Sequence, residues 1–226
     1  MKAAALTLVV ALSLSASAFA QTEARNEREY RDSYDHFVVG LRNSLPTGTA
    51  FSGVDWDDLI SGGIGLELQY SQLSRASSWV YGGWYVGLSV DSYGGRSSTL
   101  SSGGVTADIR TGRLNTAALE FGGRLRQNFN GFHLDESVGV GPLMYMKQEF
   151  DVRNGGPENL ELIKSSVSYL LDVNVRVGAP IGKNIELGLG VGLDLKGAPG
   201  EGDDVSGLNF RPMLNIVFGL TLDIGL

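Results

Sequence analysis

Hydrophobic and polar residues alternate along several stretches of this chain. In residues 185–195 every odd position is aliphatic, and the even positions are glycine or acidic. Residues 167–177 and 208–226 repeat the alternation, with Met213 and Val217 as apolar exceptions on the polar side of the last stretch. Because side chains of a β-strand point alternately to opposite faces, a period of two predicts strands with one apolar and one polar side.

Five further stretches follow this alternation less strictly, so the sequence predicts eight strands. In chain order they are Phe37–Leu45, Ile64–Tyr70, Val80–Val90, Ala117–Arg126, Phe132–Lys147, Val167–Val177, Ile185–Leu195 and Leu208–Leu226. The connections are alternately long (46–63, 91–113, 148–165, 196–207) and short (71–79, 127–131, 180–184). Long loops at one end and short turns at the other are typical of an all-β, antiparallel up-and-down barrel.

The composition of the two faces indicates which one meets lipid. Glycines 188, 190 and 192 would leave bare backbone on a water-exposed surface, whereas in a narrow lumen they make room for long neighbouring side chains. The aliphatic face of the three most regular strands carries no charged residue, as lipid exposure demands. In hydrocarbon every backbone polar group needs an internal partner, so the first and last strands must pair. We therefore predict an eight-stranded transmembrane β-barrel, with a soluble periplasmic barrel as the alternative.

The start of the chain is typical of a secreted protein. Lys2 precedes an apolar run over Ala3–Ala16, and Ala18-Phe19-Ala20 forms a small-x-small cleavage site. This predicts a signal peptide over residues 1–20. The charged segment 21–35 is expected to be a periplasmic lead-in, and residues 36–226 the barrel. These assignments place the protein in the cell outer membrane, with both termini on the periplasmic side.

Charge and cysteine content exclude several functions. The net charge is −7 without a basic block, which argues against a nucleic-acid partner. The absence of cysteine excludes disulfides and thiolate metal sites. Acidic residues gather around Trp56 and at 201–204, but neither group has EF-hand spacing. No metal and no cofactor is therefore predicted.

Charged residues with lumen-facing parity form the candidate site. Buried charges need partners, so we expect a network of ion pairs that fills the barrel, with a small gated pore as the alternative. The predicted members are Glu67, Glu120, Arg124, Asp172, Arg176, Glu186, Asp194, Arg211 and Asp223.

A second alternative is an outer-membrane lipid hydrolase. His133, Asp135 and Ser137 share one parity, which gives the residue types of a catalytic triad. Neighbours two apart on a strand are about 7 Å apart, too far for a direct relay. We therefore predict that the protein is not an enzyme.

Three residues conflict with the simple pattern. Glu136 falls on the aliphatic face between Leu134 and Val138. Pro142 and Pro212 lie inside predicted strands, where each removes a hydrogen-bond donor. We expect β-bulges, or positions near the membrane interface, at these residues.

Residues 36–226 resemble the OmpA-type and opacity-type eight-stranded outer-membrane β-barrels. The resemblance rests on the signal peptide, the alternating strands, the long and short loops and the amphipathic last strand, with no motif specific to one member. It implies a structural or surface-contact role, with outer-membrane lipid, the assembly machinery and an extracellular ligand at the four long loops as partners. The chain is expected to be a monomer. Last strands of such families usually end in an aromatic residue, whereas this chain has Phe218 but ends in Leu226.

Overall fold

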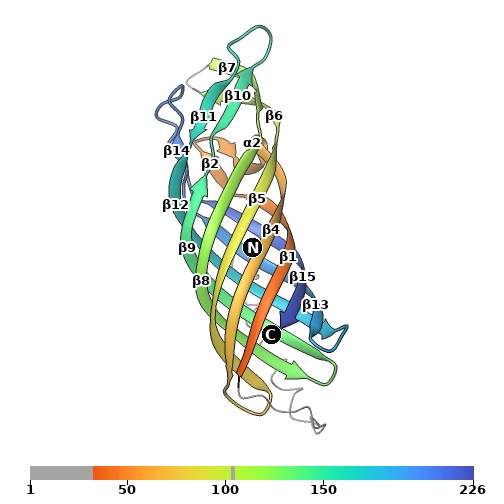
Figure 1. The fold of residues 1–226 in the computed structure, drawn as a ribbon. Coiled ribbons are helices and arrows are strands. Elements are labelled where there is room, and N and C mark those ends of the chain that lie inside the picture. Colours follow the sequence, from red (N-terminus) through yellow and green to blue (C-terminus); the bar gives the residue numbers. More distant parts are fainter. Residues whose placement is uncertain (1–32, 103–104) are drawn as a thin grey trace.

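Eight antiparallel strands close into a barrel in which each strand pairs with the next and the first pairs with the last (Figure 1). The computed structural model describes residues 33–102 and 105–226. The barrel strands are β1 (Ser33–Thr47), β4 (Ile60–Arg75), β5 (Val80–Gly95), β8 (Leu114–Phe129), β9 (Phe132–Tyr145), β12 (Ser166–Pro180), β13 (Ile185–Lys196) and β15 (Met213–Gly225). The predicted fold class is confirmed. The predicted signal peptide and most of the lead-in lie outside the described residues, and β1 begins three residues before the predicted start of the barrel.

The closing seam joins β1 and β15 in one unbroken register, from Phe37 opposite Ile224 to Leu45 opposite Ile216. Outward-facing aliphatic side chains form a belt around the barrel, and the most exposed of them include Ile64 at 69%. Inward-facing side chains are mostly polar or charged and buried. An apolar belt of this extent is far larger than a monomer exposes to water, so this side of the barrel faces lipid.

Glycines on the inner face make room for long neighbours, as the sequence predicts. A Cβ atom added at Gly188 would lie 3.0 Å from Cδ of Arg176 and 2.6 Å from Oγ1 of Thr221. The missing side chain is therefore what allows the Arg176 side chain to cross the lumen at this height.

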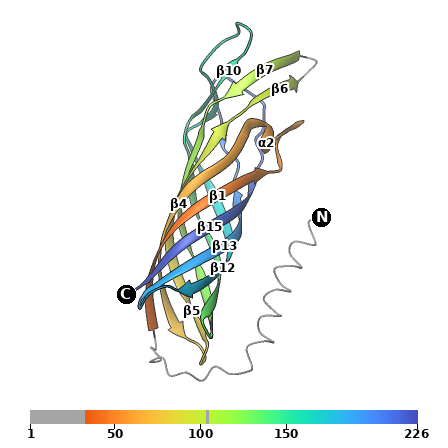
Figure 2. The ribbon, with the colours of Figure 1, turned by 90° about the vertical axis from the view of Figure 1, so that its right-hand side faces the viewer.

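The described parts of the long loops continue past one end of the barrel (Figures 1 and 2). The second and third loops, with a short strand of the fourth, build a second sheet in the order β14 (Gly200–Glu201), β11 (Leu160–Lys164), β10 (Gln148–Val152), β7 (Val105–Thr111) and β6 (Ser97–Ser102). The first loop holds the hairpin β2 (Thr49–Phe51) and β3 (Val54–Asp55), followed by the one-turn helix α2 (Trp56–Leu59). No helix in the described part of the chain has the length and apolarity to cross a membrane.

The last strand is shorter than predicted. β15 begins at Met213 rather than at residue 208. Pro212 lacks an N–H group for the ladder, and Asn209 has a left-handed backbone with φ of 51°, so the chain turns before the strand begins. Residues 208–212 fold over the long-loop end of the barrel, where Phe210 is buried.

The expected β-bulge in β9 does not form. The register between β9 and β12 runs without a shift from Tyr145 opposite Ser166 to His133 opposite Gly178. Opposite Pro142 the β8–β9 ladder merely omits two pairs and then resumes in the same register, because proline has no N–H group to donate. Glu136 therefore keeps the parity of its neighbours and faces outward.

Candidate functional site

The interior of the barrel holds buried charges in three layers. The layer nearest the short turns is built on Arg124 and Arg126 of β8. Nη2 of Arg124 lies 2.6 Å from Asp135 and 2.9 Å from Asp223. Nη2 of Arg126 lies 2.6 Å from Asp223, and its Nη1 lies 2.9 Å from Glu186. Two guanidinium groups thus bridge carboxylates from three other strands and tie the barrel walls together.

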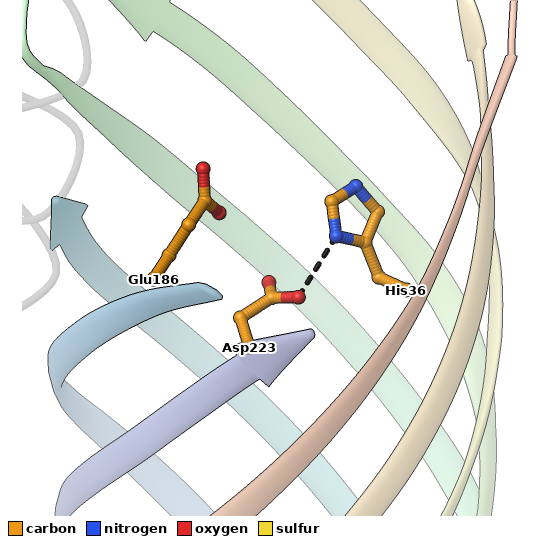
Figure 3. A group of neighbouring side chains, drawn as sticks. All are labelled: His36, Glu186 and Asp223. Carbon is orange, nitrogen blue, oxygen red and sulfur yellow. Dashed lines mark hydrogen bonds and ion pairs between the residues drawn. The ribbon is translucent and has the colours of Figure 1, made fainter. Parts of the chain in front are cut away.

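Two histidines complete this layer. Nδ1 of His36 lies 2.8 Å from a carboxylate oxygen of Asp223, with Glu186 beside the pair (Figure 3). His133 Nε2 lies 3.3 Å from Asp135. The groups His36, Glu186 and Asp223, and His133, Asp135 and Asp223, each bring three potential metal ligands together.

The arginines make these groups poor metal sites. Arg126 Nη1 lies 3.3 Å from Nε2 of His36 as well as 2.9 Å from Glu186. A bound cation would have to displace this guanidinium, which already neutralises the carboxylates. The chemistry that this layer supports is ion pairing across the lumen.

The middle layer centres on Arg42 of β1. Its guanidinium hydrogen-bonds Asp194 and lies 3.7 Å from Asp91 and 3.8 Å from Glu120. One arginine therefore serves carboxylates of three strands. Arg176 of β12 reaches across the lumen to Glu67 of β4, the strand next to β1, at 3.1 Å.

The upper layer centres on Lys196, the last residue of β13, which is 1% exposed. Its ammonium group donates to Asp91 at 2.6 Å, Tyr93 at 2.8 Å and Thr116 at 3.0 Å. An ammonium has three N–H donors, so this geometry satisfies all of them.

Above Lys196 an apolar cluster fills the mouth of the barrel at the long-loop end. It combines inward-facing residues of the barrel strands with residues of the loops, and Trp56 of α2 lies fully buried within it. The Trp56 ring stacks on Phe210, with ring centroids 5.8 Å apart. Further members of the cluster are Phe51, Leu59, Tyr93, Leu114, Leu143, Tyr145, Phe150, Leu162, Ile163, Leu170 and Met213. We call this cluster the apolar plug.

The predicted network members lie inside the barrel with one exception. Arg211 is exposed in the loop before β15, and its backbone N–H donates to the carbonyl oxygen of Ala50. The expectation that it faces the lumen is wrong because the strand begins only at Met213. The remaining predicted members face inward: Glu67, Glu120, Arg124, Asp172, Arg176, Glu186, Asp194 and Asp223.

Several network residues were missing from the prediction although their parity was readable. Arg42 lies between the outward-facing Leu41 and Asn43, which is the signal that marks it as inward-facing. Asp91 and Lys196 each lie one residue beyond a predicted strand end. Arg126 shares the parity of the predicted members Glu120 and Arg124 on β8, and Asp135 shares the inward parity of His133 on β9.

The triad residues of the hydrolase alternative are not assembled. Asp135 is bound by both Arg124 and Arg126. Among the described residues, no hydrogen bond joins Ser137 to His133 or Asp135. A serine nucleophile at this position therefore has no adjacent base.

No protein family model matches this sequence, and no curated protein matches it. Similar folds are found among solved structures. The attachment invasion locus protein Ail of Yersinia pestis is 13% identical with a TM-score of 0.47, over 87% of this chain and 100% of Ail. Neisserial surface protein A is 11% identical with a TM-score of 0.36, over 86% of this chain and 97% of that protein. A major outer membrane protein from Thermus thermophilus is 14% identical with a TM-score of 0.45, over 84% and 99% of the respective chains. The likeness concerns the fold alone.

Proposed function

We propose that this protein is an integral outer-membrane β-barrel with a filled, non-conducting interior, and that its role is structural or one of surface contact through its long loops. The observation that carries this proposal is the double obstruction of the lumen. Three layers of buried ion pairs cross the barrel, and the apolar plug covers them at the long-loop end. An open aqueous path would need both to move.

The buried ion pairs suit a structural role. Each layer links strands that lie three or four positions apart around the barrel. Arg42 on β1 reaches Glu120 on β8, Arg126 on β8 reaches Asp223 on β15, and Lys196 on β13 reaches Asp91 on β5. Removing one partner of such a pair leaves an uncompensated charge and is strongly destabilising. The network therefore resists flattening of the barrel in the membrane.

The second sheet suits surface contact. It is anchored on the barrel strands that it continues, and its outer strands β6 and β14 each have one paired neighbour in the described part of the chain. Edge strands offer backbone N–H and C=O groups to an extended segment of another chain. With both termini on the periplasmic side, this sheet would face the outside of the cell.

Conductance and gel mobility test this proposal. The outer-membrane fraction is run on SDS gels with and without boiling, and the purified protein is inserted into planar bilayers. We expect a heat-modifiable band, since a closed barrel resists SDS until heated, and no conductance above background. Voltage-dependent channel events would instead support the small gated pore. An unchanged band would contradict the membrane barrel itself.

Catalysis is tested separately. We expect the purified protein to show no lipid deacylation, because Ser137 lacks an adjacent base. Activity that is abolished by His133→Ala or Ser137→Ala would establish the hydrolase instead.

A further inference from the structure

Glu136 is an acidic residue on the lipid-facing surface. It lies four residues after Phe132, where β9 begins, and its side chain has the outward parity of the strand. Its register partners are Leu125 on β8 and Val175 on β12, both apolar. No described side chain forms an ion pair or hydrogen bond with its carboxylate. An ionisable group at membrane depth is expensive, so an unpaired one is a candidate binding site.

A groove of about 450 Å³ passes Glu136 on the outer face of the barrel. Its two walls are neighbouring rows of outward-facing residues, and its floor is the backbone of the row between them. Glu136 forms one wall together with its register partners Leu125 and Val175. The other wall is Gly123, Val138 and Val173, and the floor is the backbone of Arg124, Ser137 and Asn174. Gly123 leaves one wall open, because an added Cβ atom would meet nothing closer than the Gly83 carbonyl oxygen at 3.9 Å.

The width of the groove restricts what can lie in it. Its walls are two residues apart along the strands, which is about 7 Å. An α-helix with its side chains is about 10–12 Å across and cannot enter. Strands β8, β9 and β12 are paired on both sides, so an added β-strand is excluded as well. A single extended hydrocarbon chain fits these dimensions.

The carboxylate of Glu136 restricts which polar group can be attached to such a hydrocarbon chain. Along a strand tilted by about 35–45°, four residues correspond to about 10 Å of depth, so Glu136 is within reach of the membrane interface at the short-turn end. A primary ammonium group carries three N–H donors and a positive charge, which match a lone carboxylate. A quaternary ammonium lacks the donors, and an anionic headgroup is repelled.

We propose that Glu136 and this groove bind a phospholipid with a primary ammonium headgroup, such as phosphatidylethanolamine, with the ammonium on the carboxylate and one acyl chain along the groove. This inference rests on the proposed membrane location of the barrel.

Native mass spectrometry of the full chain in detergent tests the site. The protein is mixed separately with phosphatidylethanolamine, phosphatidylcholine and phosphatidylglycerol that carry the same acyl chains. The wild type is expected to retain one phosphatidylethanolamine in preference to the other two. Glu136→Gln should weaken this retention by about tenfold, since it removes a charge-assisted hydrogen bond. Gly123→Leu should weaken it as well, because its side chain enters the groove without moving the backbone.

Two matched variants serve as controls. Asp35→Asn removes an outward-facing acid at the short-turn end of β1, and Ala117→Leu adds bulk to the outer face of β8 away from the groove. Both should retain the lipid like the wild type. Equal retention of the three lipids, or unchanged retention in Glu136→Gln, would overturn the proposal. The proposal would also be overturned if a protein co-purified with the wild type and was lost in Glu136→Gln, because Glu136 would then bind a cationic side chain of that protein instead of a lipid.

Gel mobility separates this proposal from the proposed function. A heat-modifiable barrel without a lipid preference contradicts the lipid site alone. A band that does not change on boiling contradicts the membrane barrel, whatever lipid is retained.

Discussion

Asp172 of β12 and Asp194 of β13 lie directly opposite one another inside the barrel, and both are buried. Like charges directly opposite on neighbouring strands are destabilising. The two residues differ in their partners, since Arg42 hydrogen-bonds Asp194. Asp194 therefore belongs to the middle ion-pair layer, whereas among the described residues no arginine or lysine forms an ion pair with Asp172.

This difference predicts opposite effects of two isosteric substitutions. Asp194→Asn should lower the free energy of unfolding by about 3 kcal/mol, because it leaves Arg42 without its hydrogen-bonded carboxylate. Asp172→Asn should leave stability unchanged or raise it by about 1 kcal/mol, because it removes a carboxyl group that lies opposite Asp194 and has no ion-pair partner. Urea unfolding in lipid vesicles measures both. Equal losses in the two variants would contradict the unequal roles.

Arg126→Met tests the layer near the short turns. Loss of this guanidinium leaves Asp223, Asp135 and Glu186 with less compensation, so we expect a loss of about 3–5 kcal/mol. Arg211→Gln is the matched control, because Arg211 is exposed in a loop and should change stability by no more than about 0.5 kcal/mol. The temperature at which the folded band disappears on SDS gels reports both. If Arg211→Gln were as unstable as Arg126→Met, Arg211 would belong to the ion-pair network after all.

Trp56→Ala tests the apolar plug separately from the ion pairs. Truncation of a buried tryptophan costs about 3–5 kcal/mol of local packing. We expect faster proteolysis of the long loops with little change in the heat-modifiable band, since the barrel ladder is untouched. Planar bilayers should still show no channels, because the ion-pair layers remain. New conductance in this variant would mean that the plug alone closes the lumen.

Two inner glycines should respond differently to alanine. At Gly122 an added Cβ atom would lie 2.2 Å from the Val138 carbonyl oxygen and 2.5 Å from the Tyr85 ring, so Gly122→Ala should cost about 1–3 kcal/mol. At Gly219 the nearest atom is the Leu41 carbonyl oxygen at 3.9 Å, so Gly219→Ala should be neutral or slightly stabilising. Urea unfolding distinguishes them. Similar changes in the free energy of unfolding for both variants would show that the space around each glycine does not determine the cost of an added methyl group.

The barrel could be predicted from the sequence because lipid and lumen impose opposite demands on alternate residues. The run from Ile185 to Leu195 shows this directly, and β13 has nearly the same bounds. Errors arose where local backbone chemistry overrides the alternation. Pro212 and the left-handed backbone of Asn209 prevent the strand from beginning at residue 208. Phe210 and Arg211, which the alternation had placed in the last strand, therefore lie in the loop before β15.

The site was harder to predict than the fold. Parity indicates that Arg126 and Asp223 face the same lumen, but not that they meet at 2.6 Å, because this depends on the stagger of all the strands between them. The loop residues of the apolar plug gave no periodic signal, and within the strands only an exception such as Met213, apolar on the polar side of the last stretch, marked its place. Trp56 and Phe210 come from different loops, and only the closed barrel brings their rings together.

The seam between β1 and β15 joins the two ends of the described chain. Residues such as His36 and Gly225 that face each other there are separated by almost the whole sequence. Until the final strand has been synthesised and exported, the growing sheet has two open edges that hydrocarbon cannot solvate. Insertion must therefore wait for β15, and loss of its 13 residues would leave the other seven strands without a stable place in a bilayer.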